Sequence, residues 1–222
     1  MGSRPDLDAH LRRDDGGRSG ASSPLTPRSA AGPVGLAGTR RLLAEHLPAG
    51  AAVLDVGGAG AHASWLAGRG HPVTQADPAP ERVAEAREAG GPASGPGDAR
   101  TLRFPDRSFD AVLLLGPLHD ARDRADRLAV LGEARRVLRP GGVLVAGFAA
   151  ARGCTVADVA TEVEDAGLRA VTVTGVGGRG SRALTLVPPI DGAAAAAVLA
   201  EPAQGRPGPP DPSEHLLAVA RR

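Results

Sequence analysis

A short hydrophobic segment runs into a glycine-rich turn, and the residues best suited to bind a ligand gather there. Residues 51–56 form the apolar run, interrupted by one acidic residue, Asp55, and lead into Gly57-Gly58-Ala59-Gly60. Glycines allow the backbone to approach a ligand closely, and a helix that follows them offers unpaired N–H groups. The pattern strand, glycine turn, helix therefore predicts a ligand site at this turn.

Two kinds of ligand fit this turn. The segment from Gly58 to Ala63 matches the dinucleotide pattern G-x-G-x-x-A, and Asp77, which can hold ribose hydroxyls, follows seventeen residues after Gly60. Asp55 favours a different ligand, because a carboxylate at the strand end suits an ammonium group better than a pyrophosphate. The residues alone leave both interpretations open.

The elements around the turn predict an α/β fold. Strand-like and helix-like segments alternate, which is typical of a parallel sheet with helices on both faces. Proline and glycine lead us to expect a weak or irregular strand at 93–97, and a turn at 139–142. The other expected strands are 51–56, 71–76, 109–115, 143–148, 168–176 and 215–220; the expected helices are 36–47, one containing Trp65 and Leu66, one from Pro78-Ala79-Pro80 to Ala89, 124–138, and one ending at Gly167.

The chain of 222 residues has room for one domain and a tail. We expect a disordered tail at 1–35, which is rich in Arg, Asp, Gly, Ser and Pro, and a domain at 36–222. The tail has no apolar core, so we expect neither a signal peptide nor a membrane anchor. A single cysteine, Cys154, excludes an internal disulfide and suits a cytoplasmic protein.

The composition excludes several kinds of chemistry. The sequence contains no Lys, Tyr or Asn, so it has no lysine for a P-loop, for a pyridoxal phosphate Schiff base or for a Tyr/Lys dehydrogenase pair. The net charge is +1 and aromatic residues make up 2%, which argues against binding nucleic acid. No pattern of metal ligands stands out, so we expect no metal site.

Five motifs occur in order over residues 51–148: VLDVGGAGA, QAD, GDA, FDAVLLLGPL and RVLRPGG. Together they resemble the class I S-adenosylmethionine-dependent methyltransferase family, and the closing SEHLLAVARR is similar to the family's last strand. The resemblance implies a Rossmann-like, doubly wound sheet of seven strands in the order 3-2-1-4-5-7-6, with the last strand antiparallel. It also implies that S-adenosylmethionine lies across the ends of the first four strands.

The resemblance assigns roles to individual residues. Asp77 would accept the ribose hydroxyls, and His119, after the fourth strand, is a candidate general base toward the substrate. The remaining residues would contact the methionine portion (Asp55, Gly57, Gly58, Gly60), the adenine (Asp98, Ala99), and the region of the methyl group (Gly116, Pro117).

The sequence departs from the family at Ala59 and Ala61, which stand where the usual D-x-G-x-G-x-G turn has glycines. A methyl group there can crowd the cofactor or require an unfavourable φ angle. We therefore predict methyl transfer to a small-molecule nucleophile, with a degenerate, non-catalytic binding module as the alternative. A nicotinamide-dependent oxidoreductase is the third interpretation. The methyl acceptor and the oligomeric state stay open.

Overall fold

The computed structural model describes residues 33–58, 60–88, 91, 93–149, 155–176 and 215–222. The helices are α2 (Pro33–His46), α3 (Ala61–Ala67), α4 (Pro80–Glu88), α5 (Pro117–Asp120), α6 (Arg124–Val137) and α7 (Val156–Asp165). The strands are β1 (Val53–Val56), β2 (Val73–Asp77), β3 (Ala93–Pro96), β4 (Phe109–Leu114), β5 (Leu138–Ala149), β6 (Arg169–Val176) and β7 (His215–Arg221). The expected disordered tail lies almost wholly outside these residues.

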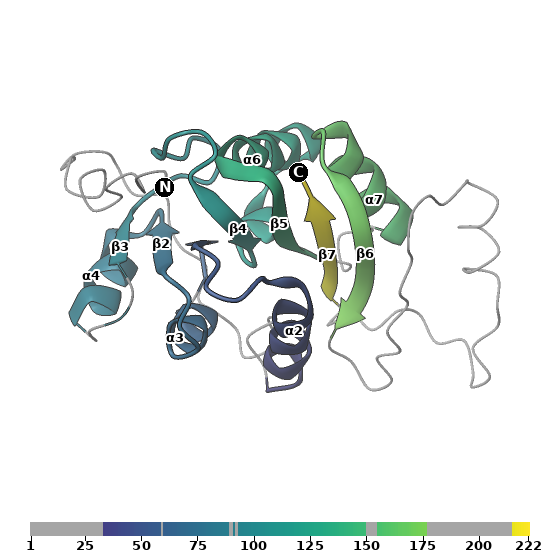
Figure 1. The fold of residues 1–222 in the computed structure, drawn as a ribbon. Helices are drawn as coiled ribbons and strands as arrows, with labels where there is room; N and C mark the ends of the chain where they lie inside the picture. Colours follow the sequence, from purple (N-terminus) through teal and green to yellow (C-terminus); the bar gives the residue numbers. More distant parts are fainter. Residues whose placement is uncertain (1–32, 59, 89–90, 92, 150–154, 177–214) are drawn as a thin grey trace.

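The strands form one seven-stranded sheet in the order β3-β2-β1-β4-β5-β7-β6 (Figure 1). The first five strands of the chain pair in parallel, whereas β7 runs antiparallel to both β5 and β6. The predicted fold class, strand order and antiparallel last strand are therefore confirmed. The order of strands reverses between β1 and β4. The connections that follow these two strands therefore run in opposite directions, which creates a switch point between them.

Helices cover both faces of the sheet, which explains why β1 is buried along its whole length. On one face Leu54 and Leu114 share a hydrophobic cluster with Leu131 of α6 and with α7. On the other, Val53 belongs to a cluster that includes Leu43 of α2 and residues of α3. Figure 1 shows these two pairs of helices on opposite sides of the sheet.

Two segments differ from the expectations. Residues 93–96 form a regular strand with a continuous register from Thr74↔Ala93 to Asp77↔Pro96. Proline is tolerated because β3 is an edge strand and has a partner on one side only. The expected turn at 139–142 lies inside β5, where the register jumps from Phe109↔Leu138 to Ala111↔Val143, so that its residues loop out of the ladder.

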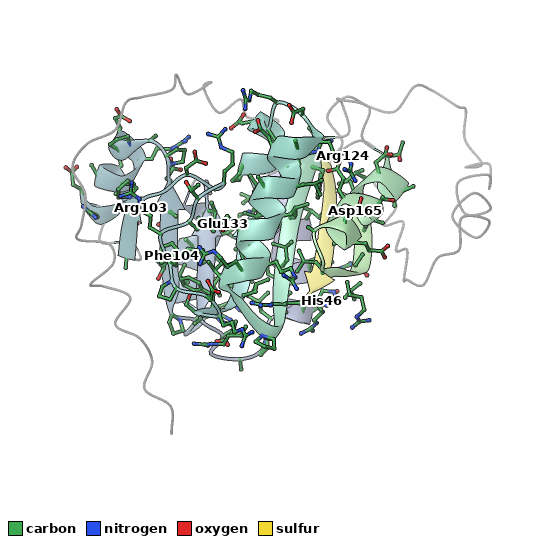
Figure 2. The ribbon with its side chains drawn as sticks, turned by 90° about the horizontal axis from the view of Figure 1, so that it is seen from above. His46, Arg103, Phe104, Arg124, Glu133 and Asp165 are labelled. Atoms are coloured by element: carbon green, nitrogen blue, oxygen red, sulfur yellow. The ribbon has the colours of Figure 1, made fainter. Side chains whose placement is uncertain are left out.

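The connection from β3 to β4, residues 97–108, contains no helix, and side chains of α6 hold its backbone in place. Arg136 donates hydrogen bonds to the carbonyl oxygens of Leu102 (2.7 Å) and Phe104 (2.8 Å). Glu133 accepts one from the N–H of Leu102 (2.8 Å) and pairs with Arg136. Figure 2 shows Phe104 and Arg103 beside Glu133 of α6. These contacts supply the hydrogen bonds that a crossover helix would otherwise make internally.

Candidate functional site

The turn after β1 and the turn after β4 meet at the switch point. Gly57 and Gly60 have φ angles of +65° and +78°, a region that favours glycine. A Cβ atom on Gly57 would lie 3.0 Å from Cγ of Pro117, and one on Gly116 would lie 2.6 Å from the carbonyl oxygen of Gly57. Glycine is therefore required here both by backbone conformation and by the close approach of the two turns.

The structure excludes an unfavourable φ angle at Ala61. Ala61 is the first residue of α3, and Gly60 before it supplies the left-handed N-cap. The one described residue other than glycine with a positive φ is Arg107, so Ala61 carries no such strain. Ala59 lies outside the described residues.

Asp55 is an ionisable group with almost no exposure to solvent. Its side chain is 1% exposed, and neither carboxylate oxygen has a hydrogen-bond partner of normal geometry within the described chain. Gly58 lies against it, because a Cβ on Gly58 would be 2.3 Å from Oδ1. Burial, and secondarily the charge of Asp77, raise the pKa of Asp55 to about 7, while a contact from the Gln75 amide acts in the opposite direction.

Asp77 ends β2 beside this group. Its Oδ1 accepts hydrogen bonds from the N–H of Ala79 and from Nε of Arg82, both at 2.9 Å. Its Oδ2 is buried and has no partner among the residues that the structure describes. Asp77 thus stabilises the start of the following segment with one oxygen, while the other could accept two further hydrogen bonds.

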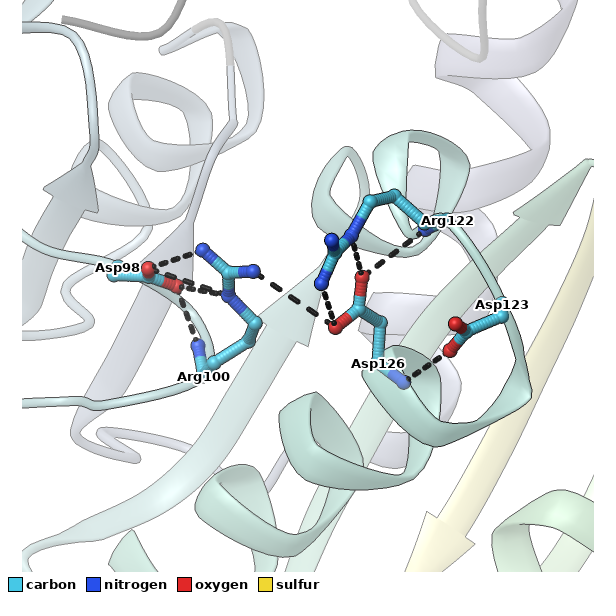
Figure 3. A network of polar contacts seen from close by, with 5 residues as sticks. All are labelled: Asp98, Arg100, Arg122, Asp123 and Asp126. Carbon is cyan, nitrogen blue, oxygen red and sulfur yellow. Dashed lines mark hydrogen bonds and ion pairs between the residues drawn. The ribbon is translucent and has the colours of Figure 1, made fainter.

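Asp98 lies just after β3, in an ionic network with the start of α6 (Figure 3). Its Oδ1 accepts from the backbone N–H of Arg100 (2.8 Å), and its Oδ2 from the guanidinium (2.7 Å). The Arg100 hydrogen bonds hold the pKa of Asp98 below its ordinary value. Arg100 also reaches Asp126 at 3.8 Å, which itself pairs with Arg122. Ala99, next to Asp98, is buried in the core.

His119 lies in α5, close to the switch point. Its backbone N–H donates to the carbonyl of Gly116 at 2.9 Å. Its Nε2 is shielded from solvent and lies 3.6 Å from the position that a Cβ on Gly147 of β5 would take. This nitrogen therefore faces β5 of the sheet.

Two polar residues that the sequence analysis missed also belong to this region. Gln75 (6% exposed) and Ser94 (3% exposed) are paired in the β2–β3 register, and Gln75 is paired with Asp55 in the β1–β2 register. Oγ of Ser94 donates to Oε1 of Gln75 at 3.2 Å. The signal in the sequence was a glutamine two residues before Asp77, and hence on the same face of a strand expected to be buried.

The sites predicted from separate motifs fall into one region. The segments that carry them all follow the carboxyl ends of the parallel strands β1 to β4. Within the described residues, no three His, Cys, Asp or Glu side chains are grouped to hold a metal ion. Over the same residues, every helix is too short or too polar to cross a membrane.

Comparisons with known proteins agree with this architecture. Residues 54–146 match a family model described as a methyltransferase domain. A search of curated protein sequences gave no match.

Similar solved structures include a TehB-like SAM-dependent methyltransferase from Corynebacterium glutamicum, with 24% identity, 83% of this chain and 87% of that chain covered, and a TM-score of 0.60. The N-methyltransferase NodS from Bradyrhizobium japonicum has 18% identity, 86% and 97% coverage, and a TM-score of 0.61. The 1,6-didemethyltoxoflavin-N1-methyltransferase from Burkholderia thailandensis has 20% identity, 88% and 79% coverage, and a TM-score of 0.58.

At such low sequence identity the structural neighbours establish only the fold. The family model adds a sequence match over the segment that contains the candidate site. That segment runs from β1 into β5 and includes both turns that meet at the switch point. Residues 54–146 therefore match a methyltransferase domain, and the chain has the fold of the S-adenosylmethionine-dependent methyltransferases to which it is similar.

Proposed function

We propose that this protein transfers the methyl group of S-adenosylmethionine to a nucleophilic atom of a small molecule. The observation that carries the proposal is a set of buried carboxylate oxygens that have no hydrogen-bond partner in the described part of the chain: both oxygens of Asp55 and Oδ2 of Asp77. Buried acceptors left without donors are costly unless a ligand satisfies them. The cofactor of this family brings an ammonium group and two ribose hydroxyls, which are donors of the required kind.

The assignment of residues follows from their places in the fold. Asp77 would hold the ribose through Oδ2, and the half-exposed carboxylate of Asp98 would accept a hydrogen bond from the adenine amino group. Asp55 and the glycines at 57, 58 and 60 would hold the methionine portion, Ala99 would meet the adenine edge, and Gly116 and Pro117 would border the region of the methyl group. The cofactor, when bound, supplies an activated methyl group, and these residues would orient it.

A small-molecule acceptor is supported by the charge and by one neighbour. The net charge of +1 and the 2% of aromatic residues do not provide the basic, stacking surface that nucleic acid requires. The Burkholderia thailandensis neighbour was solved with bound 1,6-didemethyltoxoflavin and S-adenosylhomocysteine. A cytoplasmic location is part of the proposal and is supported by the single cysteine.

His119 is the proposed general base, because it lies in α5 directly after the turn that follows β4. Methyl transfer to a protonated nucleophile benefits from a nearby base whose pKa lies close to neutral. Once an acceptor is known, the rate of His119→Ala should fall below that of wild type between about pH 6 and 9, and the difference should be smallest at the low end, where the imidazole of wild type is protonated. A rate profile unchanged from wild type would remove His119 from the mechanism.

Calorimetric titration with S-adenosylmethionine and S-adenosylhomocysteine tests the cofactor site directly. We expect saturable binding by the wild-type protein and at least about tenfold weaker binding by Asp77→Ala, which loses a charge-assisted acceptor. Glu164→Ala, an exposed position on α7, is the matched control and should bind as wild type does. NAD should not bind. Absence of binding by the wild-type protein at millimolar ligand would contradict the proposal.

A further inference from the structure

Three buried polar residues form a row across adjacent strands on the site's face of the sheet. Asp55 on β1, Gln75 on β2 and Ser94 on β3 are direct register partners, with exposures of 1%, 6% and 3%. Polar side chains at such positions reduce stability unless they are well bonded. The row ends at Asp55, the one member whose oxygens have no partner of normal geometry among the described residues.

The amide of Gln75 has a defined orientation. Its Oε1 accepts from Oγ of Ser94 at 3.2 Å, which turns Nε2 away from β3. A Cβ added to Gly60 would lie 3.9 Å from this Nε2, so the amide nitrogen lies beneath the glycine turn. The amide also favours the ionised form of Asp55, as a donor directed at a carboxylate should.

We propose that Gln75, with its amide held by Ser94, is a positioning residue that orients the Asp55 carboxylate toward the ammonium group of the cofactor's methionine portion. The inference rests on the proposed function and deepens it, since it names what prepares the acidic group for a cation. An amide that lies beside a carboxylate in the register favours one orientation of the carboxylate and leaves its lone pairs for a ligand. Asp77 adds negative charge nearby, so a cation is the ligand group that this end of the site prefers.

A pair of ligands separates positioning from a general structural role. S-adenosylhomocysteine carries the amino-acid portion, whereas 5′-methylthioadenosine has the same nucleoside and lacks that portion. For Gln75→Met, which keeps the volume and removes the amide, we expect affinity for S-adenosylhomocysteine to fall about tenfold, because Asp55 loses the polar group beside it that fixes its orientation. Affinity for 5′-methylthioadenosine should change less than about twofold.

Two further variants complete the experiment. Ser94→Ala should shift the affinity ratio of the two ligands in the same direction by a smaller factor. Thr74→Val is the matched control, because Thr74 is equally buried on β2 but points to the opposite face, and its ratio should equal that of wild type. Thermal unfolding of each variant, measured without ligand, establishes that it is folded.

The outcomes distinguish this inference from the proposed function. If wild-type protein binds S-adenosylhomocysteine and Asp55→Asn weakens it, but Gln75→Met and Ser94→Ala leave the ligand ratio unchanged, Gln75 does not position Asp55. An equal loss of both ligands in Gln75→Met also overturns the inference, since it indicates a structural role. If wild-type protein binds neither ligand, the proposed function itself fails.

Discussion

The Cα of Gly58 packs directly against the carboxylate of Asp55, and a Cβ at this position would lie 2.3 Å and 2.4 Å from the two oxygens. The neighbouring glycines of the turn are required by φ angle or by contacts between backbones. Gly58 differs from them, because its absent side chain makes room for a functional group. In the D-x-x-G spacing of this turn, the glycine is therefore required because the Asp55 carboxylate occupies the space of its side chain.

We predict that Gly58→Ala destabilises the fold and abolishes cofactor binding, because the added methyl group must displace the buried Asp55 carboxylate. The loss in unfolding free energy should be about 1–3 kcal/mol in urea denaturation. Gly132→Ala on α6 is the control, since a Cβ there meets nothing within 4 Å. That substitution should stabilise the protein by about 0.5–1 kcal/mol through helix propensity. Similar effects of both substitutions would contradict the packing argument.

Asp55 should make the ligand-free protein less stable as pH rises. Its pKa is raised from 3.8 to about 7 in the folded state, so between these values the folded chain binds a proton that the unfolded chain has released. The free energy of unfolding therefore decreases with pH over this window, by an amount on the order of a few kcal/mol. Asp55→Asn should be more stable than wild type at pH 8 and should lose this advantage near pH 4.

His62 has the opposite effect on the pH dependence of stability in part of the same pH range. The contribution of Asp55 must therefore be obtained by comparing wild type with Asp55→Asn at each pH. Burial, and secondarily the charge of Arg40, lower the pKa of His62 from 6.5 to about 4. The unfolded chain then binds the extra proton between these values, and stability increases with pH there. Subtracting the melting temperatures of Asp55→Asn from those of wild type at each pH removes the His62 contribution. A difference independent of pH would show that Asp55 does not titrate near neutrality.

Arg136, a partly exposed residue of α6, should contribute strongly to the stability of the fold. It donates to two backbone carbonyl groups of the 97–108 connection and pairs with Glu133 and Asp106. We expect Arg136→Ala to cost about 2–3 kcal/mol, because these acceptors lose charge-assisted hydrogen bonds. Arg41→Ala, which breaks an exposed i,i+4 pair with Glu45, should cost less than about 0.5 kcal/mol. Equal costs in denaturant unfolding would refute the structural role of Arg136.

Asp98 should make the site select a 6-amino purine over a 6-oxo purine. Arg100 keeps the carboxylate ionised, so Asp98 can only accept hydrogen bonds. Wild-type protein should bind S-adenosylhomocysteine at least about tenfold more tightly than the inosyl analogue, which presents an acceptor instead of a donor. Asp98→Asn should narrow this preference, since its amide can donate to the oxo group. An unchanged preference would exclude Asp98 from the adenine subsite.

The order of the elements was predictable because most strands of this fold are short apolar runs that can be recognised in the local sequence. The buried runs at 53–56 and 109–114 and the glycine turn between them identify the centre of the sheet. The edge strand β3 was harder to predict, because its prolines and glycines argue against a strand unless one knows that only one neighbour pairs with it. Strand position within the sheet is a property of the whole fold.

The polar row of Asp55, Gln75 and Ser94 could not be read from the sequence, because it depends on register across three strands. Gln75 and Ser94 lie 19 residues apart in the chain, and their hydrogen bond exists only after the sheet has formed. Likewise the role of Arg136 depends on a connection more than thirty residues away. Motifs identified the acids at the strand ends, whereas the side chains that support them came from tertiary structure.

The side-chain contacts between α6 and the 97–108 connection also affect how the molecule opens. Segments that share their hydrogen bonds tend to open together as one cooperative unit. Amide protons of the connection should then exchange with solvent at rates set by α6, and a ligand held at Asp98 would slow exchange in a helix that it does not touch. A substitution that destabilises α6 should therefore also weaken the binding of a nucleoside at Asp98.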